Sequence, residues 1–499
     1  MKKIIAFLFV TLFFCFSSSA SFNFNDTCKS AYEKIICTRF EEGLTIINQE
    51  KKTNPQNLIP YYLENYIDFL TLFISEDASL FNKLKPNKEL RISKIEDSEN
   101  NSPYYNYCLA EIYLQWAFAR IKFKEYITAA GEINKAYKLL KENEEKYPDF
   151  IPNLKGLGIL HSLIGTIPDE YKWATKLVGI TGTINQGVSE LTSILNMSLK
   201  NEEYAYLKTE SIFYLTFIQL NLQSNKDKAL QLAKYLNTPS FSALIENNPL
   251  LCYAAASISL KTGSNDNAIQ ILLNRPKGEE YYPFHYLDFL LGSAKLNRLD
   301  NDAFSYFYLF LTRFKGQNYI KAAYQKLAWY FLINGNTEKY KEKILLASSL
   351  GSSTMDEDNQ ALSESKSNTV PNITLLKARL LFDGGYYQKA LNIMIEKNPS
   401  DFCKTTKDYL EYTYRLGRIF DEWEYDTKAI SYYELTIKNG SNSTYYFAAN
   451  SALHLGMIYE NQKNKTKAIY YYKLCSTFKN NEYKTSINQK AKAGLNRLQ

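Results

Sequence analysis

The chain has 499 residues, a formal net charge of +7 and a hydrophobic content of 45%. This content supports a real core and excludes a disordered chain, and the length suits several domains or one long solenoid. After residue 20 no apolar run is long enough to span a bilayer, so we expect no transmembrane segment in the mature chain. Tyrosine accounts for 41 residues, which we interpret as coding bias and not as one extended aromatic binding surface.

Residues 1–20 have the composition of a secretory signal peptide. Lys2 and Lys3 give a basic start, and the apolar run Ile4–Phe16 follows. That run has only 13 residues, whereas a membrane-spanning helix needs about 20. Ser18-Ser19-Ala20 then supplies small residues where a signal peptidase would cut. We therefore predict export, to a bacterial periplasm or cell envelope or into the medium.

The cysteines indicate neither a lipid anchor nor a metal site. Cys15 follows Leu12 at the spacing of a lipoprotein signal, but the bulky Phe14 beside it argues against lipidation. The other six cysteines are scattered and include no Cys-x-x-Cys pair. On one continuous helix, Cys28 and Cys37 would lie about 13 Å apart on opposite faces, so a disulfide between them needs a helix break.

Two C-terminal segments repeat the same small and large residues at the same offsets. From each glycine, an aromatic residue follows after three positions and further matching residues after 12, 16 and 19. The first set is Gly417, Phe420, Ala429, Tyr433 and Thr436, and the second is Gly456, Tyr459, Ala468, Tyr472 and Cys475. Two helices packed about 8–10 Å apart need small residues where their backbones cross. The pattern therefore predicts two helical hairpins with the glycine and the alanine of each set at the crossing.

This pattern resembles the tetratricopeptide repeat. Degenerate copies extend it towards the N-terminus, at Ala378–Met394, Ala256–Leu272 and Ala117–Ala136. Strand signals are nearly absent, whereas apolar spacing typical of helices recurs throughout. Because one hairpin cannot bury its apolar face alone, successive pairs must stack. The resemblance implies an all-α fold, an α-α superhelix built as a tetratricopeptide-like solenoid of degenerate helical hairpins.

The segment Ser348–Asn372 breaks the helical pattern. It contains seven serines, the acidic cluster Asp356-Glu357-Asp358 and Pro371 near its end. Such a composition predicts a long solvated loop or linker. We accordingly divide the chain into a signal peptide (1–20), a degenerate helical-repeat body (21–347), a linker (348–372) and C-terminal tetratricopeptide-like repeats (373–499).

Residues 153–195 interrupt the body with six glycines. Each glycine costs about 1 kcal/mol inside a helix, so we predict close helix crossings and tight turns. The segment lacks the strand context and the Gly-Lys-Ser/Thr ending of a P-loop, which excludes a phosphate cradle of that kind. A glycine-led helix, the Ser162…Pro168 turn and the run Gly179-x-x-Gly182…Gly187 resemble the tetratricopeptide-related inclusion-body clearance family. The resemblance implies a non-enzymatic helical fold, and Thr183 departs from it where an acidic residue is expected.

No constellation of residues points to catalysis, a metal or a cofactor. His161, His285 and His454 lie in no His-Glu-x-x-His motif and near no second ligand at metal spacing. A Gly-x-Ser-x-Gly nucleophile elbow is absent from the sequence. Adjacent carboxylates such as Glu41-Glu42 indicate solvated faces, although carboxylates from distant helices could still act together in a hydrolase. We expect no enzyme, and therefore no catalytic, cofactor-binding or metal-binding residues.

Ligands of tetratricopeptide solenoids usually meet the inner faces of the first helices, and the resemblance places a partner-binding set there. The set comprises Glu411, Tyr414, Arg418 and Asp421 from one unit and Asn450, Leu453, Met457 and Glu460 from the next. Together they would form a mixed polar and aromatic groove suited to a peptide or an extended segment. The alternative is that these side chains merely face water or a neighbouring loop.

The basic charge is concentrated at the C-terminal end, where residues 440–499 hold nine Lys or Arg and two acidic residues. We interpret this as the solvated face of a capping helix; the alternative is an anionic partner or peripheral association with the envelope. The leading prediction is an exported scaffold that binds a protein or peptide partner and no nucleic acid. A glycan- or nutrient-binding envelope protein ranks second, since Cys15 is a poor anchor and only four tryptophans are present. A helical hydrolase ranks third.

Overall fold

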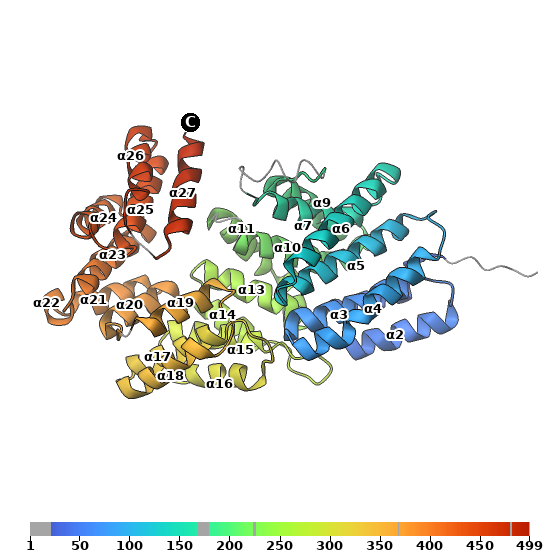
Figure 1. The fold of residues 1–499 in the computed structure, drawn as a ribbon, viewed down its shortest axis with the longest axis horizontal. Coiled ribbons are helices and arrows are strands. Elements are labelled where there is room, and N and C mark those ends of the chain that lie inside the picture. The colour runs from blue at the N-terminus through green and yellow to red at the C-terminus, as the bar shows by residue number, and fades with distance from the viewer. Residues whose placement is uncertain (1–20, 168–178, 223–225, 368, 480–481, 499) are drawn as a thin grey trace, which may run out of the picture. The chain divides into compact units, whose positions relative to one another are not determined.

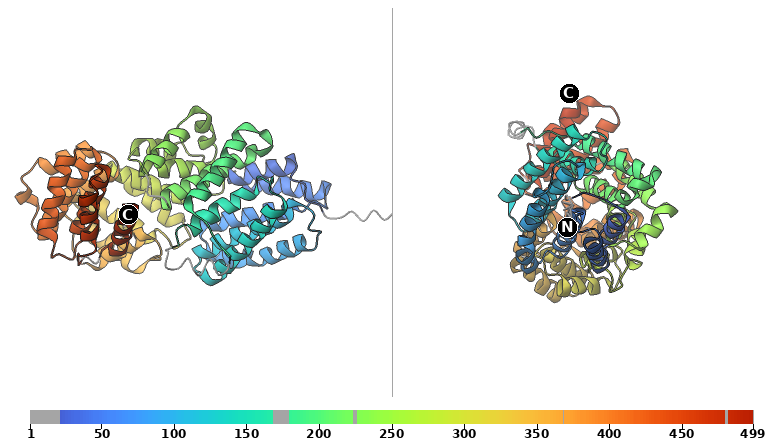
Figure 2. Two further views of the ribbon diagram at one scale, coloured as in Figure 1. Left: turned by 90° about the horizontal axis from the view of Figure 1, so that it is seen from above. Right: turned by 90° about the vertical axis from the view of Figure 1, so that its right-hand side faces the viewer.

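The computed structural model describes residues 21–167, 179–222, 226–367, 369–479 and 482–498. In this part of the chain every regular element is a helix (Figures 1 and 2). Among the same residues a single isolated β-bridge joins Ser21 to Asn57. Neighbouring helices pack in pairs and the pairs stack on one another. The prediction of an all-α, tetratricopeptide-like superhelix is therefore confirmed. The predicted signal peptide (1–20), Pro168 and Trp173 lie outside the described residues.

The chain forms two compact units. Within the described residues no helix has both the length and the apolar character needed to cross a membrane. Unit 1 comprises Met1–Asn225, Ala243–Ala254 and Pro276–Phe284, and unit 2 comprises Lys226–Ser242, Ala255–Arg275 and His285–Gln499. Helices α12 (Pro239–Glu246) and α13 (Pro249–Lys261) contribute residues to both units.

Unit 1 is built around α5, which is buried on nearly all sides by the surrounding helices. Ser102 caps it by accepting a hydrogen bond from the Tyr104 amide. Every residue from Asn106 to Arg120 except Phe118 is buried. The unit's helices are α1 (Asp26–Ile36), α2 (Phe40–Thr53), α3 (Ile59–Ser75), α4 (Ala78–Glu96), α5 (Pro103–Lys122), α6 (Tyr126–Lys146), α7 (Asn153–Ile164), α9 (Ile184–Lys200), η2 (Glu202–Leu207) and α10 (Lys208–Asn221).

The glycine-rich segment contains a close helix crossing, as its composition predicts. Helices α7 and α9 meet at Gly158 and Gly187, where a Cβ on Gly187 would lie 2.1 Å from the Gly158 carbonyl oxygen. No side chain fits at that distance, so the crossing depends on glycine at this position. Gly179 lies at the end of the connection with φ +76°, a conformation that favours glycine.

Unit 2 contains the best-matched repeats. We call α17, α20, α23, α25 and α27 its first helices, because each packs against the next in this series, and all but α27 also pack against the second helix of their own pair. The helices of the unit are α11 (Lys226–Leu236), α14 (Asn265–Leu273), α15 (Tyr286–Asn297), α16 (Ala303–Arg313), α17 (Ile320–Ile333), α18 (Thr337–Ser349), α19 (Asp356–Lys366), α20 (Ile373–Asp383), α21 (Tyr387–Ile395), α22 (Pro399–Phe402), α23 (Thr406–Glu422), α24 (Asp426–Gly440), α25 (Phe447–Asn461), α26 (Lys465–Cys475) and α27 (Lys484–Arg497).

The two predicted hairpins are the pairs α23–α24 and α25–α26. Ala429 and Ala468 are fully buried, as expected for residues at a crossing. A Cβ on Gly417 would lie 2.7 Å from the Tyr433 ring, and one on Gly456 would lie 2.5 Å from the Tyr472 ring. The glycines therefore make room chiefly for the tyrosine of the second helix, in addition to allowing the backbones to approach.

The sequence predicts a solvated loop at Ser348–Asn372, but the segment contains helix α19. The prediction of a loop is wrong for these helical residues. Asp358 and Ala361 of α19 are fully buried against α17 and α18. The Asp358 carboxylate accepts hydrogen bonds from the amides of Tyr319 at 2.6 Å and Ala322 at 3.0 Å. The acidic cluster thus stabilises the N-termini of two helices. It lies in the first turn of α19, and Asp358 also accepts hydrogen bonds from two backbone amides at the start of α17.

Candidate partner-binding site

The structure places the eight predicted partner-binding residues on α23 and α25, at different depths. Tyr414 and Leu453 are 3% and 2% exposed and belong to the hydrophobic core of the two hairpins. The other six side chains are half-buried: Glu411, Arg418, Asp421, Asn450, Met457 and Glu460. The buried pair supports this surface from below.

Tyr414 joins the two repeats through its hydroxyl group. Its oxygen accepts hydrogen bonds from Arg418 Nη1 at 3.1 Å and from Asn450 Nδ2 at 2.6 Å. Because Arg418 is on α23 and Asn450 is on α25, one phenol oxygen fixes polar side chains of two first helices. Three of the predicted residues are therefore brought together.

Asp421 and Glu460 are each held by partners within the fold. Tyr433 donates a hydrogen bond to Asp421 at 2.8 Å, and His454 Nδ1 lies 2.9 Å from the same carboxylate oxygen. Burial would raise the pKa of Asp421, but the hydrogen bond from His454 leads the opposing effects and holds it below its ordinary value. Arg497 Nε and Nη2 donate to the two oxygens of Glu460 at 2.7 and 2.8 Å. These two carboxylates are structural groups at the edge of the surface.

Sequence reasoning missed the cations that lie on the neighbouring first helices. The Arg379 guanidinium of α20 lies 4.9 Å from the centroid of the Trp329 ring, and Lys326 Nζ of α17 lies 5.3 Å from the same centroid. The Arg418 guanidinium lies 4.9 Å from the Phe382 ring. Each cation therefore rests against an aromatic face, which orients it without neutralising it. We call Lys326, Arg379, Arg418 and Lys490 the cationic surface.

The two lysines of the cationic surface lie close to other cations. Burial lowers the pKa of Lys326, and the Arg379 guanidinium lowers it further. Burial also lowers the pKa of Lys490, with further lowering by Lys261 and Arg418. Neither lysine ammonium forms an ion pair within 4.0 Å among the described residues. Like charges gathered on one surface indicate a place for an anionic group.

Among the described residues, the two arginines of this surface have only distant ion-pair partners. Arg379 Nε lies 3.7 Å from Asp383, and Arg418 Nη2 lies 3.7 Å from Glu422. Arg418 Nε is buried without a hydrogen-bond partner in the described part of the chain. Arg415 differs, because its Nε donates to Glu411 Oε1 at 2.8 Å and the pair is closed. The unsatisfied donor thus belongs to Arg418 and not to Arg415.

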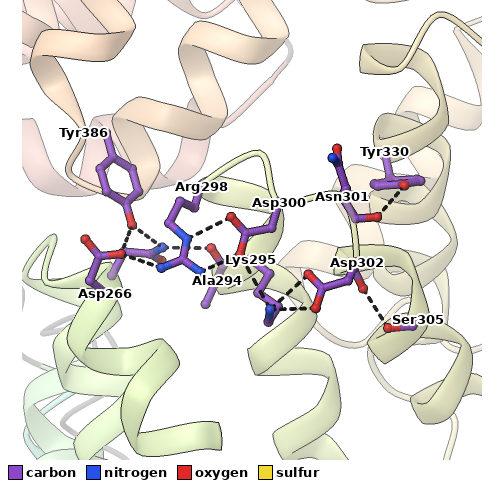
Figure 3. Close-up of polar contacts among 11 residues, drawn as sticks. Asp266, Ala294, Lys295, Arg298, Asp300, Asn301, Asp302, Ser305, Tyr330 and Tyr386 are labelled. Atoms are coloured by element: carbon purple, nitrogen blue, oxygen red, sulfur yellow. Dashed lines mark hydrogen bonds and ion pairs between the residues drawn. The ribbon is translucent and has the colours of Figure 1, made fainter.

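A second polar cluster in unit 2 is fully engaged within the fold (Figure 3). Arg298 donates to both oxygens of Asp300, at 2.8 and 2.6 Å, and to Asp266 at 2.8 Å. The Tyr386 hydroxyl also donates to Asp266, at 2.8 Å. These contacts tie the start of α14 to the end of α15 and to the turn before α21, so the cluster stabilises the stacking of pairs.

No metal-binding site is evident among the residues that the structure describes. Within it, no three His, Cys, Asp or Glu side chains are grouped so that they could hold a metal ion. His161 is hydrogen-bonded to Glu190 through Nδ1 at 2.8 Å, and His454 is bound to Asp421. Both of these histidines therefore have a structural partner.

Comparisons with known proteins give no family for the chain. No protein-family model and no curated protein matches the sequence. A solved structure, "Crystal structure of APC/C hetero-tetramer Cut9-Hcn1", is similar over 92% of this chain and 95% of that chain, with 13% sequence identity and a TM-score of 0.23. At that TM-score the likeness supports no inference about function.

Proposed function

We propose that the chain is an exported, non-enzymatic scaffold that binds a protein or peptide partner through the first helices of unit 2. Its location would be a bacterial periplasm or cell envelope, or the medium. The stacked helical hairpins support the general role, because repeat folds of this kind expose long surfaces suited to extended partners. The basic start, apolar run and small residues of 1–20 support export.

The partner would present an extended anionic segment to the cationic surface. The observation that carries this proposal is the position of Lys326, Arg379, Arg418 and Lys490 on four different first helices, where neither lysine has an ion pair within 4.0 Å among the described residues. An acidic peptide lying across the first helices would pair with these groups in turn. The aromatic rings beside them would contact the apolar parts of such a peptide.

A binding titration tests the anionic partner. The probe is a fluorescently labelled ten-residue glutamate peptide, and the protein is the full mature chain. We expect binding that weakens as salt is added, and a loss of at least about tenfold in affinity for the triple variant Lys326→Glu, Arg379→Glu, Lys490→Glu. The matched control changes Lys341, Lys463 and Lys465 to Glu, which alters the net charge equally on other parts of unit 2. Equal loss in both variants would mean that only net charge matters and would contradict the site.

Export and partner identity need separate measurements. The mass of the mature N-terminus distinguishes cleavage before Ser21 from lipidation at Cys15. An affinity pull-down from envelope extract with the wild-type chain and the triple variant then identifies proteins that depend on the cationic surface. If no protein is recovered specifically while an oligosaccharide binds saturably, the scaffold proposal fails.

A glycan-binding role is the second candidate, and one observation favours it. A shallow pocket in unit 2 is lined by Trp423, Tyr386, Tyr387, Gln388 and Lys389. Aromatic rings beside amide and ammonium donors suit the apolar face and the hydroxyl groups of a sugar. Oligosaccharide binding that is lost in Trp423→Ala but retained in the triple variant would favour this role.

The resemblance of residues 153–195 to the inclusion-body clearance family also stays a proposal. The close crossing at Gly158 and Gly187 supports it, since the glycines of that pattern then have a packing reason. Substitution of Gly187 by alanine tests only the packing, and a partner shared with that family would be needed to support a shared role.

A further inference from the structure

Unit 1 contains a buried ionic cluster that the partner-binding proposal does not use. Lys155 of α7 is 1% exposed, and its ammonium lies 2.7 Å from Glu111 Oε2 and 3.1 Å from Glu210 Oε2. The two carboxylates come from α5 and α10 and are also almost completely buried. One ammonium thus faces two carboxylates in a medium where unbalanced charge is costly.

Tyrosines surround this cluster but do not balance its charge. Lys155 Nζ lies 5.5–5.8 Å from the ring centroids of Tyr32, Tyr62, Tyr66 and Tyr107. The hydroxyls of Tyr32 and Tyr66 donate to Glu210. Phenol groups are neutral, so the cluster still lacks one positive charge.

Glu111 carries the consequence of that imbalance. Its Oε1 is buried and has no hydrogen-bond partner among the described residues. Burial raises the pKa of Glu111 to about 7, against the pull of Lys155. At neutral pH a proton therefore supplies part of the missing charge. The titratable groups that interact with Glu111 are Lys155 (α7), Glu210 and Tyr214 (α10), Tyr62 (α3), and Tyr107 and Cys108 (α5), whereas Tyr32 (α1) and Tyr66 (α3) act on Glu210.

An apolar cavity adjoins the cluster. Its volume is about 80 Å³, and Glu210 forms part of its wall together with Tyr66 and Tyr214. Five phenylalanines (Phe69, Phe73, Phe118, Phe213 and Phe217) line it as well, together with Ile36, Leu70, Ile159, Thr209 and Leu250. A protein cavity of about 150 Å³ accommodates benzene, so one of about half that volume suits a short alkyl chain.

We propose that this cavity binds a small aliphatic ammonium ion, with its alkyl chain among the phenylalanines and its charge towards Glu210. The ammonium supplies the positive charge that the cluster lacks, and the rings of Tyr66 and Tyr214 offer it aromatic faces. A carboxylate of the same length is repelled by Glu210, and a neutral alcohol gains only the apolar contacts. The inference is independent of the cationic surface of unit 2.

Isothermal titration calorimetry of the full mature chain tests the proposal, with n-butylammonium, 1-butanol and butyrate as probes. We expect n-butylammonium to bind at least about tenfold more tightly than 1-butanol, and butyrate not to bind. Titrations at pH 7 in two buffers of different ionisation enthalpy should show net proton release that becomes smaller at pH 8.5, because more of Glu111 is then already ionised. Equal affinity for butanol, or no binding of either compound, overturns the proposal.

Variants locate the site. Glu210→Gln should abolish the preference for the ammonium over the alcohol. Glu111→Gln leaves one ammonium facing one carboxylate, so the charge of the cluster is balanced. This variant should also abolish the preference for the ammonium, and it leaves the cavity wall unaltered. It therefore serves as the test if Glu210→Gln does not fold. Phe217→Trp fills the cavity and should weaken n-butylammonium binding about tenfold, whereas the matched change Phe304→Trp in unit 2 should leave it unchanged. Unchanged binding in Phe217→Trp would place the ligand elsewhere and overturn the assignment.

Discussion

At the scale of single residues, Gly456 shows how tightly the two helices of a pair approach each other. Alanine has the better helix propensity, by about 1 kcal/mol. At Gly456, however, its methyl group would lie 2.5 Å from the Tyr472 ring, which is buried and has no room to move. We expect Gly456→Ala to destabilise unit 2 by about 1–3 kcal/mol, measured by urea unfolding followed by circular dichroism.

Gly131 provides the matched control for that substitution. It also lies within a helix, α6, but nothing lies within 4 Å of a Cβ built on it. Gly131→Ala should therefore stabilise the chain by up to about 1 kcal/mol. A loss of stability in both variants would show that the tyrosine ring is not the cause.

Glu111 gives unit 1 a specific dependence on pH. Its folded pKa of about 7 lies above its ordinary value of 4.5. A raised carboxyl pKa stabilises the fold when both states are protonated, below pH 4.5, and that contribution is lost as pH rises through 7. We expect the urea midpoint of unit 1 to fall between pH 5 and 8, and to fall less in Glu111→Gln. The difference between the two proteins is the relevant quantity, since other groups titrate in the same range.

At the scale of elements, α19 stabilises a helix other than itself. Its Asp358 carboxylate accepts from the amides of Tyr319 and Ala322 at the start of α17. Asp358→Ala leaves both amides without that partner and should cost about 1–3 kcal/mol, measured by chemical unfolding. The control Asp356→Ala removes the same carboxylate group from an exposed position of α19. It should change stability by less than about 0.5 kcal/mol. Similar effects of the two changes would contradict the role given to Asp358.

The elements that sequence predicts best are those fixed by local spacing. The offsets after Gly417 and Gly456 are read within one hairpin, and the helix pairs follow from them. Helix α19 could not be predicted in this way, because its apolar content is low and its main stabilising contact is made by Asp358 to a helix that begins 38 positions earlier. The prediction of a solvated loop at Ser348–Asn372 was wrong because the polar composition of the segment was taken to mean that it is exposed to solvent.

The candidate site was predicted only in part, for a similar reason. Helix spacing identifies α23 and α25 and most of their half-buried residues, although it does not reveal that Tyr414 and Leu453 face the core. Lys326, Arg379 and Lys490 carry no common local motif, and each is an ordinary lysine or arginine in its own helix. They share one surface only because the first helices stack, and that stacking depends on contacts between distant segments.

At the scale of the whole molecule, the last helix closes a stack that would otherwise end in apolar surface. Helix α27 packs on α25 and α26, where Ile487 and Ala491 are buried and Gly494 lies against the Tyr472 ring. Terminal repeats of solenoids need such a cover for solubility. We expect a chain that ends at residue 481 to lose stability in unit 2 and to self-associate, as measured by thermal unfolding and size-exclusion chromatography. A truncated chain as stable and monodisperse as the full protein would contradict the capping role.

The interleaving of the two units has a consequence for how the protein is made. Unit 1 needs residues up to Phe284, whereas unit 2 takes Lys226–Ser242 and Ala255–Arg275 from the middle of the chain. A growing polypeptide therefore cannot complete its first unit before part of the second has emerged, and no single cut separates the two. The order of the segments therefore predicts that unit 1 reaches its full set of contacts only after residues up to Phe284 have been made.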